Sequence, residues 1–225
     1  MKKKLKSIIK GIFNRHYYSN NSYAQEGEDL IIDRLLEKKN KGFYLEVGCH
    51  HPFRFSNTYF FYKKGWSGLC IDPLPGVGEE FSRWRKRDTI IEKGVSSTEG
   101  HLMYYMFNDP ALNTFDEALA KKRDGFHGYR LIEKRKIQVS PLSSIIEDSG
   151  YNGKIDFLSV DVEGLDLEVL QSNNWEKYRP KIVVAESLSQ EVVFFKDRIY
   201  QYLQDLDYKF YAKTGNSLIF IDARG

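Results

Sequence analysis

The stretch from residue 155 to residue 164 constrains the fold of this chain more than any other. A largely apolar run ends abruptly in Asp161 and Glu163, and Gly164 follows them. Residues 165–170 then restart with apolar side chains at helical spacing, so the order predicts a buried parallel strand, a tight turn and a helix. Ligands of open parallel sheets bind at the carboxyl ends of strands, whereas acids at helix starts also serve as caps. Both roles are open for Asp161 and Glu163 at this point.

The same alternation of strand and helix runs through the rest of the chain. Buried strands are expected at residues 43–48, 68–72, 89–95 and 181–186, and further strands at 101–107 and 136–139. The chain closes with a hairpin, because a Thr-Gly-Asn turn at 214–216 separates the runs 208–213 and 217–221. These elements predict an α/β fold with a mostly parallel seven-stranded sheet and a C-terminal antiparallel hairpin. That is the Rossmann-like architecture of class I methyltransferases.

Composition limits the class of protein further. The 225 residues suit one domain, which we place at residues 22–225, after a basic N-terminal arm at residues 1–21. The net charge of +3 is too small to indicate nucleic-acid binding. No apolar run is long enough to span a bilayer and no signal peptide is evident, so we expect a cytoplasmic protein. The oligomeric state stays open.

The N-terminal arm allows two interpretations. Lysines surround apolar residues throughout residues 1–18, which is typical of helices that lie on an anionic membrane surface. Such a helix would hold the protein at the inner face of the membrane. A solvated arm, or a helix that packs on a neighbour, accounts for the same pattern.

The turn after the first strand, Glu46-Val47-Gly48, limits the cofactors that the sheet can bind. A dinucleotide pyrophosphate typically binds Gly-x-Gly-x-x-Gly at a helix start, and this turn has one glycine before two histidines and Pro52. Gly48 still permits close approach of a ligand to the backbone, and the Glu46 carboxylate suits an ammonium group. A compact ligand that carries its own ammonium is therefore favoured, which indicates S-adenosylmethionine.

Residues after the next strands fit the same cofactor. Asp72 ends the second strand, where an acid typically accepts the ribose hydroxyls of an adenosyl ligand, and with Pro73 it also suits an Asp-Pro turn. Val95 and Ser96 follow the third strand and are expected to contact the adenine through their backbone. Asn57 is expected to reach the carboxylate of the methionine moiety, in a segment that also caps a helix.

Acids at the ends of later strands are the candidates for chemistry. Adjacent parallel strands lie about 4.8 Å apart, so Asp161 and Glu186 are expected to converge. Clustered carboxylates raise each other's pKa or bind a cation, and oxygen ligands favour Mg²⁺. Methyl transfer to a hydroxyl requires that its proton be removed by a base or after acidification by a metal, and Asp161 suits both roles. Glu163 is expected to hold the turn, with a secondary role toward the substrate.

Histidines and basic residues complete the set of candidates. His50 and His51 lie on the loop after the first strand, and His51 is our candidate general base, with a structural role as the alternative. Arg54 is a candidate for binding an anionic substrate group. The basic runs at residues 83–87 and 134–136 are expected on solvated faces.

Taken in order, these motifs resemble the FkbM-type methyltransferases, a group of S-adenosylmethionine-dependent O-methyltransferases. The resemblance implies a Rossmann-like fold, bound S-adenosylmethionine and methyl transfer to oxygen, commonly on sugars of surface polysaccharides. Residues 50–58 resemble the branch associated with bacterial surface-glycan synthesis. Cys49 replaces the small apolar residue that is more common in the family, and residues 1–18 lie outside the resemblance. The matching stretches are residues 23–29, 43–48, 55–58, 65–68, 71–73, 155–170 and 183–186.

The sequence therefore predicts an S-adenosylmethionine-dependent O-methyltransferase that acts on a hydroxyl of a saccharide or glycan intermediate. The alternative is a catalytically silent scaffold that binds S-adenosylmethionine within a glycan-assembly complex. A silent module has no need of acids at the ends of its strands, which favours the enzyme. An NAD-dependent oxidoreductase is disfavoured because the glycine fingerprint is missing.

Overall fold

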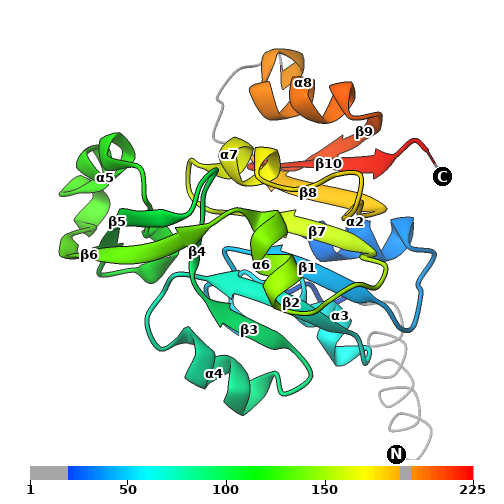
Figure 1. Ribbon diagram of the computed structural model, residues 1–225, viewed down its shortest axis with the longest axis horizontal. Coiled ribbons are helices and arrows are strands. Elements are labelled where there is room, and N and C mark those ends of the chain that lie inside the picture. Colours follow the sequence, from blue (N-terminus) through cyan, green and yellow to red (C-terminus); the bar gives the residue numbers. More distant parts are fainter. Residues whose placement is uncertain (1–19, 188–193, 225) are drawn as a thin grey trace, which may run out of the picture.

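A seven-stranded sheet forms the centre of the protein (Figure 1), and its strand order is β3-β2-β1-β7-β8-β10-β9. The computed structural model describes residues 20–187 and 194–224. Residues 1–19 of the predicted arm lie outside this part. The strands of this sheet are β1 (Phe43–Val47), β2 (Ser67–Asp72), β3 (Thr89–Glu92), β7 (Phe157–Val160), β8 (Ile182–Glu186), β9 (Tyr208–Lys213) and β10 (Ser217–Asp222).

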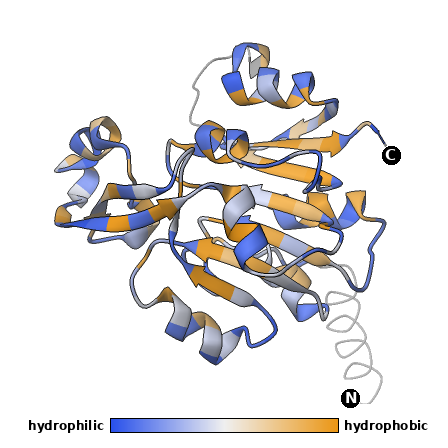
Figure 2. Ribbon diagram, viewed as in Figure 1, coloured by the Kyte–Doolittle hydropathy of each residue, from blue (hydrophilic) through white to orange (hydrophobic). Residues whose placement is uncertain are grey.

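The predicted sheet architecture is confirmed. Strands β3, β2, β1, β7 and β8 pair in parallel, and the carboxyl ends of the central strands meet at one edge. Strand β10 pairs antiparallel with both β8 and β9, which makes the C-terminal hairpin. Figure 2 shows hydrophobic residues concentrated in these central strands, as expected for strands buried on both faces.

Helices cover both faces of the sheet. Ile32 of α2, Phe61 of α3 and Phe81 of α4 pack with Tyr44 on one face. Leu142 of α6 and the apolar residues of α7 and α8 pack on the other face. Successive residues of a strand point to opposite faces, so each central strand contributes to both cores. These helices are α2 (Glu28–Leu35), α3 (Tyr59–Lys63), α4 (Val77–Trp84), α6 (Leu142–Asp148), α7 (Asp166–Gln171) and α8 (Arg198–Asp205), preceded by a short turn η3 (Phe194–Lys196).

A second, three-stranded sheet of order β4-β6-β5 projects from the main sheet (Figure 1), and the sequence did not predict it. The expected single strand at 89–95 is in fact divided: β3 stays in the main sheet, while β4 (Gly94–Val95) pairs with β6. We call residues 94–140 the insertion. Its other elements are β5 (Gly100–Phe107), η1 (Pro110–Leu112), α5 (Glu117–Arg123), η2 (Phe126–Gly128) and β6 (Leu131–Ser140).

Strand β6 is much longer than the strand expected at 136–139. It pairs antiparallel with β5 from Leu131 to Val139, although residues 132–136 are all exposed. A strand that is exposed on both faces shows no alternation of apolar and polar residues, so its sequence resembles that of a polar loop. None of the helices in the described part of the chain is both long and apolar enough to cross a membrane.

Candidate active site

A pocket of about 290 Å³ opens where the carboxyl ends of the central strands meet the insertion. The strand ends supply one wall, with Gly48 after β1, Asp72 at the end of β2 and Asp161 after β7. The insertion supplies a roof that includes Tyr104 and Asn113. Parallel sheets of this kind bind their ligands at this edge, so the pocket is the candidate active site.

Gly48 brings the loop after β1 directly against the end of β7. Its φ of +84° is in the left-handed region that glycine adopts without strain. A Cβ atom at this position would lie only 1.7 Å from the carbonyl oxygen of Asp161. Any side chain here would therefore separate the first turn from the acid at the end of β7.

Asp72 is a buried carboxylate whose position is fixed by two backbone groups. The His50 N–H donates to Oδ2 at 2.7 Å and the Leu74 N–H donates to Oδ1 at 2.8 Å. Burial raises the pKa of Asp72 to about 6. Pro73 and Val95 line the same part of the pocket, so four predicted cofactor residues, Gly48 among them, lie together there.

Three other predicted cofactor residues face elsewhere, which corrects those predictions. The Glu46 carboxylate accepts a hydrogen bond of 2.5 Å from the Thr58 hydroxyl and lies 3.8 Å from Arg85. The Asn57 amide donates to the Ser159 hydroxyl at 2.9 Å. Ser96, which was predicted to use its backbone, donates its N–H to the Ser140 carbonyl at 3.1 Å and its hydroxyl to Glu168 at 2.7 Å. None of the three is part of the pocket lining. Each side chain is occupied by a protein partner, and strand-end position alone does not reveal this.

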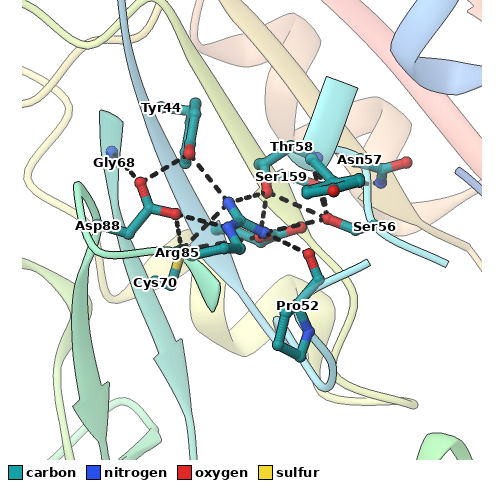
Figure 3. A network of polar contacts seen from close by, with 12 residues as sticks. Tyr44, Pro52, Ser56, Asn57, Thr58, Gly68, Cys70, Arg85, Asp88 and Ser159 are labelled. Atoms are coloured by element: carbon teal, nitrogen blue, oxygen red, sulfur yellow. Dashed lines mark hydrogen bonds and ion pairs between the residues drawn. The ribbon is translucent and has the colours of Figure 1, made fainter. Parts of the chain in front are cut away.

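Arg85, which the sequence suggested to be solvated, is instead fully buried beneath the loop after β1 (Figure 3). Its Nε donates to Asp88 at 2.6 Å, and its Nη2 donates to the hydroxyls of Tyr44 at 2.9 Å and Thr58 at 2.7 Å. Its Nη1 donates to the Pro52 carbonyl at 3.3 Å. A buried guanidinium with this many acceptors fixes the loop that forms one wall of the pocket.

The two histidines of this loop have different surroundings, and the prediction for His51 is not supported by them. His51 Nδ1 accepts hydrogen bonds from the N–H groups of Phe53 and Arg54, so it stabilises the turn. His50 lines the pocket, and neither of its ring nitrogens has a partner in the described part of the chain. Burial and then the charge of Arg54 lower the pKa of His50 to about 4, so it is neutral near pH 7. The sequence alone could not indicate which of these two adjacent histidines faces the pocket.

Asp161, Glu163 and Glu186 converge after β7 and at the end of β8, as predicted for the first and last of them, and Asp161 and Glu163 line the pocket. One ligand oxygen from each lies within 4.8 Å of the others. Burial raises the pKa of Asp161 well above its usual value, and the nearby Glu163 adds to this rise. Burial and then the charge of Asp161 raise the pKa of Glu186 far above its usual range. The carboxyl groups of Asp161 and Glu186 lie close together, and the charge on Asp161 opposes ionisation of Glu186.

Glu163 occupies a turn position and is paired with a cation. Its φ of +57° is in the left-handed region, and its carbonyl accepts a hydrogen bond from the Thr114 hydroxyl at 2.7 Å. Its carboxylate forms an ion pair with Arg123 of the insertion. The turn itself is held by Asp166, which accepts from the N–H groups of Val162 and Gly164. Glu163 therefore connects the turn to the insertion, while its side chain still lines the pocket.

The sheet order and the pocket at the carboxyl ends of its parallel strands define a class I methyltransferase fold. The chain belongs to the methyltransferase FkbM domain family, whose model matches residues 46–210. The family implies S-adenosylmethionine as the methyl donor. Among solved structures, the chain is similar to a crystal structure of a Klebsiella pneumoniae protein assigned as an O-methyltransferase. The identity is 9% and the TM-score 0.44, over 93% of this chain and 86% of that one. No curated protein sequence matches the chain.

Proposed function

We propose that this methyltransferase transfers the methyl group to a hydroxyl of a saccharide, in the synthesis of a bacterial surface polysaccharide. The observation that carries the choice of oxygen is the pair of neighbouring carboxyl groups of Asp161 and Glu186, of which Asp161 lines the pocket. A hydroxyl must lose its proton when it is methylated, and a carboxylate of raised pKa is a suitable acceptor. The saccharide and its pathway rest on the family resemblance.

The pocket suits an adenosyl ligand at the end formed by β1 and β2. The first turn offers bare backbone at Gly48, and Asp72 offers carboxylate oxygens that can accept hydroxyl hydrogens beside their two backbone bonds. Pro73 and Val95 offer apolar surface to a flat ring. When bound, S-adenosylmethionine supplies an electrophilic methyl group. These residues hold and orient the ligand, which is the largest part of what such a reaction requires of the protein.

The acid end of the pocket acts on the proton of the acceptor. Burial raises the pKa values of both carboxyl groups, so an ionised carboxylate in this pair is a stronger base than an exposed one. As the acceptor oxygen takes the methyl carbon, the sulfur of the donor would keep the electron pair of the broken sulfur–methyl bond and leave as the thioether S-adenosylhomocysteine, while the proton of the acceptor hydroxyl would pass to Asp161. Solvent at the mouth of the pocket then removes the extra proton and restores the pair.

Aromatic and acidic side chains together favour a sugar as the acceptor. Phe55, Phe115 and Tyr129 line the pocket. Aromatic faces pack against the apolar faces of a sugar ring, while carboxylates accept hydrogen bonds from its hydroxyls. We place the acceptor between these rings and Asp161.

We also propose Mg²⁺ as an alternative means of lowering the pKa of the acceptor hydroxyl. The acid cluster of Asp161, Glu163 and Glu186 is an oxygen-only set, and this chemistry suits Mg²⁺. Arg123 already pairs with Glu163, so a cation would compete with this guanidinium. Loss of turnover after dialysis against a chelator, with recovery on addition of Mg²⁺, would support a metal; undiminished turnover would remove it.

The function is tested with purified full-length protein, methyl-labelled S-adenosylmethionine and a glycan fraction from cells that lack the gene. We expect label in the glycan, and mass spectrometry should show one added methyl group per modified sugar, on oxygen. Binding of S-adenosylhomocysteine without any label transfer would instead favour the silent scaffold. Label on nitrogen or on protein would overturn the proposed acceptor.

A further inference from the structure

Asn113 is a buried amide in the roof of the pocket, and its donor group is unpaired. It follows η1 in the insertion, and only 6% of its surface is exposed. Its Oδ1 accepts a hydrogen bond from the Phe107 N–H at 2.8 Å. A backbone N–H can be accepted only by the oxygen, so this bond fixes which way the amide points.

The opposite side of this amide faces the ligand space. Asn113 lines the pocket, and its Nδ2 has no hydrogen-bond partner among the residues that the structure describes. Buried donors without a partner are rare in native proteins, since each loses its bonds to water without replacement. A ligand that offers an acceptor atom at this point would satisfy the amide.

The neighbours of Asn113 indicate which ligand this is. Burial raises the pKa of the Tyr104 phenol, the charges of Asp72 and, less strongly, Glu163 add to the rise, and Asn113 opposes it. Tyr104 and Asp72 line the pocket together with Asn113, whose Nδ2 has no hydrogen-bond partner among the described residues. The segment that carries the amide is held against the loop after β1, because Arg54 donates two hydrogen bonds of 3.0 Å to Asp109, and the same loop contacts Asp72 through the His50 N–H.

We propose that the side-chain amide of Asn113 donates a hydrogen bond to the adenosyl group of the methyl donor. This rests on the proposed use of S-adenosylmethionine. An adenosyl group offers hydroxyl donors that match the Asp72 carboxylate and ring-nitrogen acceptors that match an amide N–H. Asn113 would then make recognition of the donor depend on the insertion as well as on the strand ends.

The test is calorimetric titration of full-length protein with two ligands, S-adenosylhomocysteine and 5′-methylthioadenosine, which lacks the amino-acid part. Asn113→Asp keeps an oxygen for the Phe107 N–H and replaces the donor by a second oxygen. We expect both ligands to bind about tenfold more weakly, by a similar factor. If this variant unfolds at the assay temperature, Asn113→Ala serves for the same comparison.

Asn173→Asp is the matched control. Asn173 is also buried, with 8% of its surface exposed, but its Nδ2 donates to the Tyr178 carbonyl at 2.9 Å and it lies outside the pocket lining. It should bind both ligands as the wild type does. Wild-type affinity in the Asn113 variants would overturn the inference, and so would a loss for S-adenosylhomocysteine alone. A wild-type protein that binds neither ligand would defeat the proposed function itself.

Discussion

The loop after β1 contacts two clusters of buried carboxylates that differ in how their charge is balanced. In the first, which we call the Arg85 cluster, Glu46 and Asp88 face a guanidinium that is fully buried with them. In the acid cluster, one half-buried guanidinium, that of Arg123, pairs with Glu163 only. The first cluster has a cation at its centre, whereas the second has an excess of acid.

The difference separates a structural role from a chemical one. The hydroxyls of Tyr44 and Thr58 accept further hydrogen bonds from Arg85. The carboxylates of this cluster do not line the pocket. In the acid cluster, Glu186 Oε2 has no partner among the described residues, and Asp161 lines the pocket. Balanced buried charge fixes a loop, and unbalanced buried charge keeps a proton available for exchange.

The largest expected effect is on turnover, from a change in the acid cluster. Asp161→Asn removes the proton acceptor with little change in shape, so we expect turnover to fall about 10²- to 10⁴-fold. Affinity for S-adenosylhomocysteine should stay within about twofold, because the donor end of the pocket is unaltered. Both are measured on the same preparation, by label transfer and calorimetry. Wild-type turnover in this variant would remove Asp161 from the chemistry.

The next effect is on stability, from a change in the Arg85 cluster. Arg85→Met leaves Glu46 and Asp88 buried without their cation, so we expect the free energy of unfolding to fall by about 3–5 kcal/mol. Burial, opposed by Arg85, already raises the pKa of Glu46 to about 7. Urea denaturation followed by fluorescence measures the loss.

Arg83→Met is the control for this change, since Arg83 lies in the last turn of α4, just before Arg85 in the chain, and is exposed. It should cost less than about 0.5 kcal/mol. Equal losses in the two variants would show that the buried guanidinium has no special structural role. The double variant with Asp88→Asn should recover part of the loss in Arg85→Met, because it removes one of the unpaired charges.

The two clusters also show how far sequence reasoning reaches. Period-two and period-3.6 patterns predicted the main sheet, and strand ends then placed Gly48, Asp72, Asp161 and Glu186 at one edge. Those residues are found because topology alone brings strand ends together. Residues 131–135 of β6, the second sheet and the roof of the pocket were missed, because they depend on pairing between segments that show no apolar period.

Side-chain partners were beyond what the sequence could indicate. Arg85 stands in a basic run that is typical of a solvated helix face, yet it follows the last turn of α4 and turns inward. Glu46 ends in a motif that resembles a cofactor site, but Arg85 and Thr58 occupy its carboxylate. The one indication of a buried Arg85 is indirect, because acids that are buried near the first strand require a buried cation.

The smallest expected effect concerns the one cation of the acid cluster. Arg123 lowers the pKa of Glu163 against the larger rise from burial, and it acts in the same direction on Glu186. Arg123→Gln should therefore raise the pKa values of the cluster further. The proton acceptor must be ionised to act, so turnover rises with pH, and the rise should move to higher pH by about one unit.

The measurement is label transfer across a pH series, with Lys121→Gln as the control. Lys121 lies on the same helix, but it pairs with the exposed Glu117 and not with the acid cluster. An unmoved profile in Arg123→Gln would mean that a group other than the acid cluster titrates. A loss of stability in Arg123→Gln as large as that in Arg85→Met would contradict the distinction between the two clusters. Arg123 would then be a structural cation, and the acid cluster would resemble the Arg85 cluster more closely than its geometry indicates.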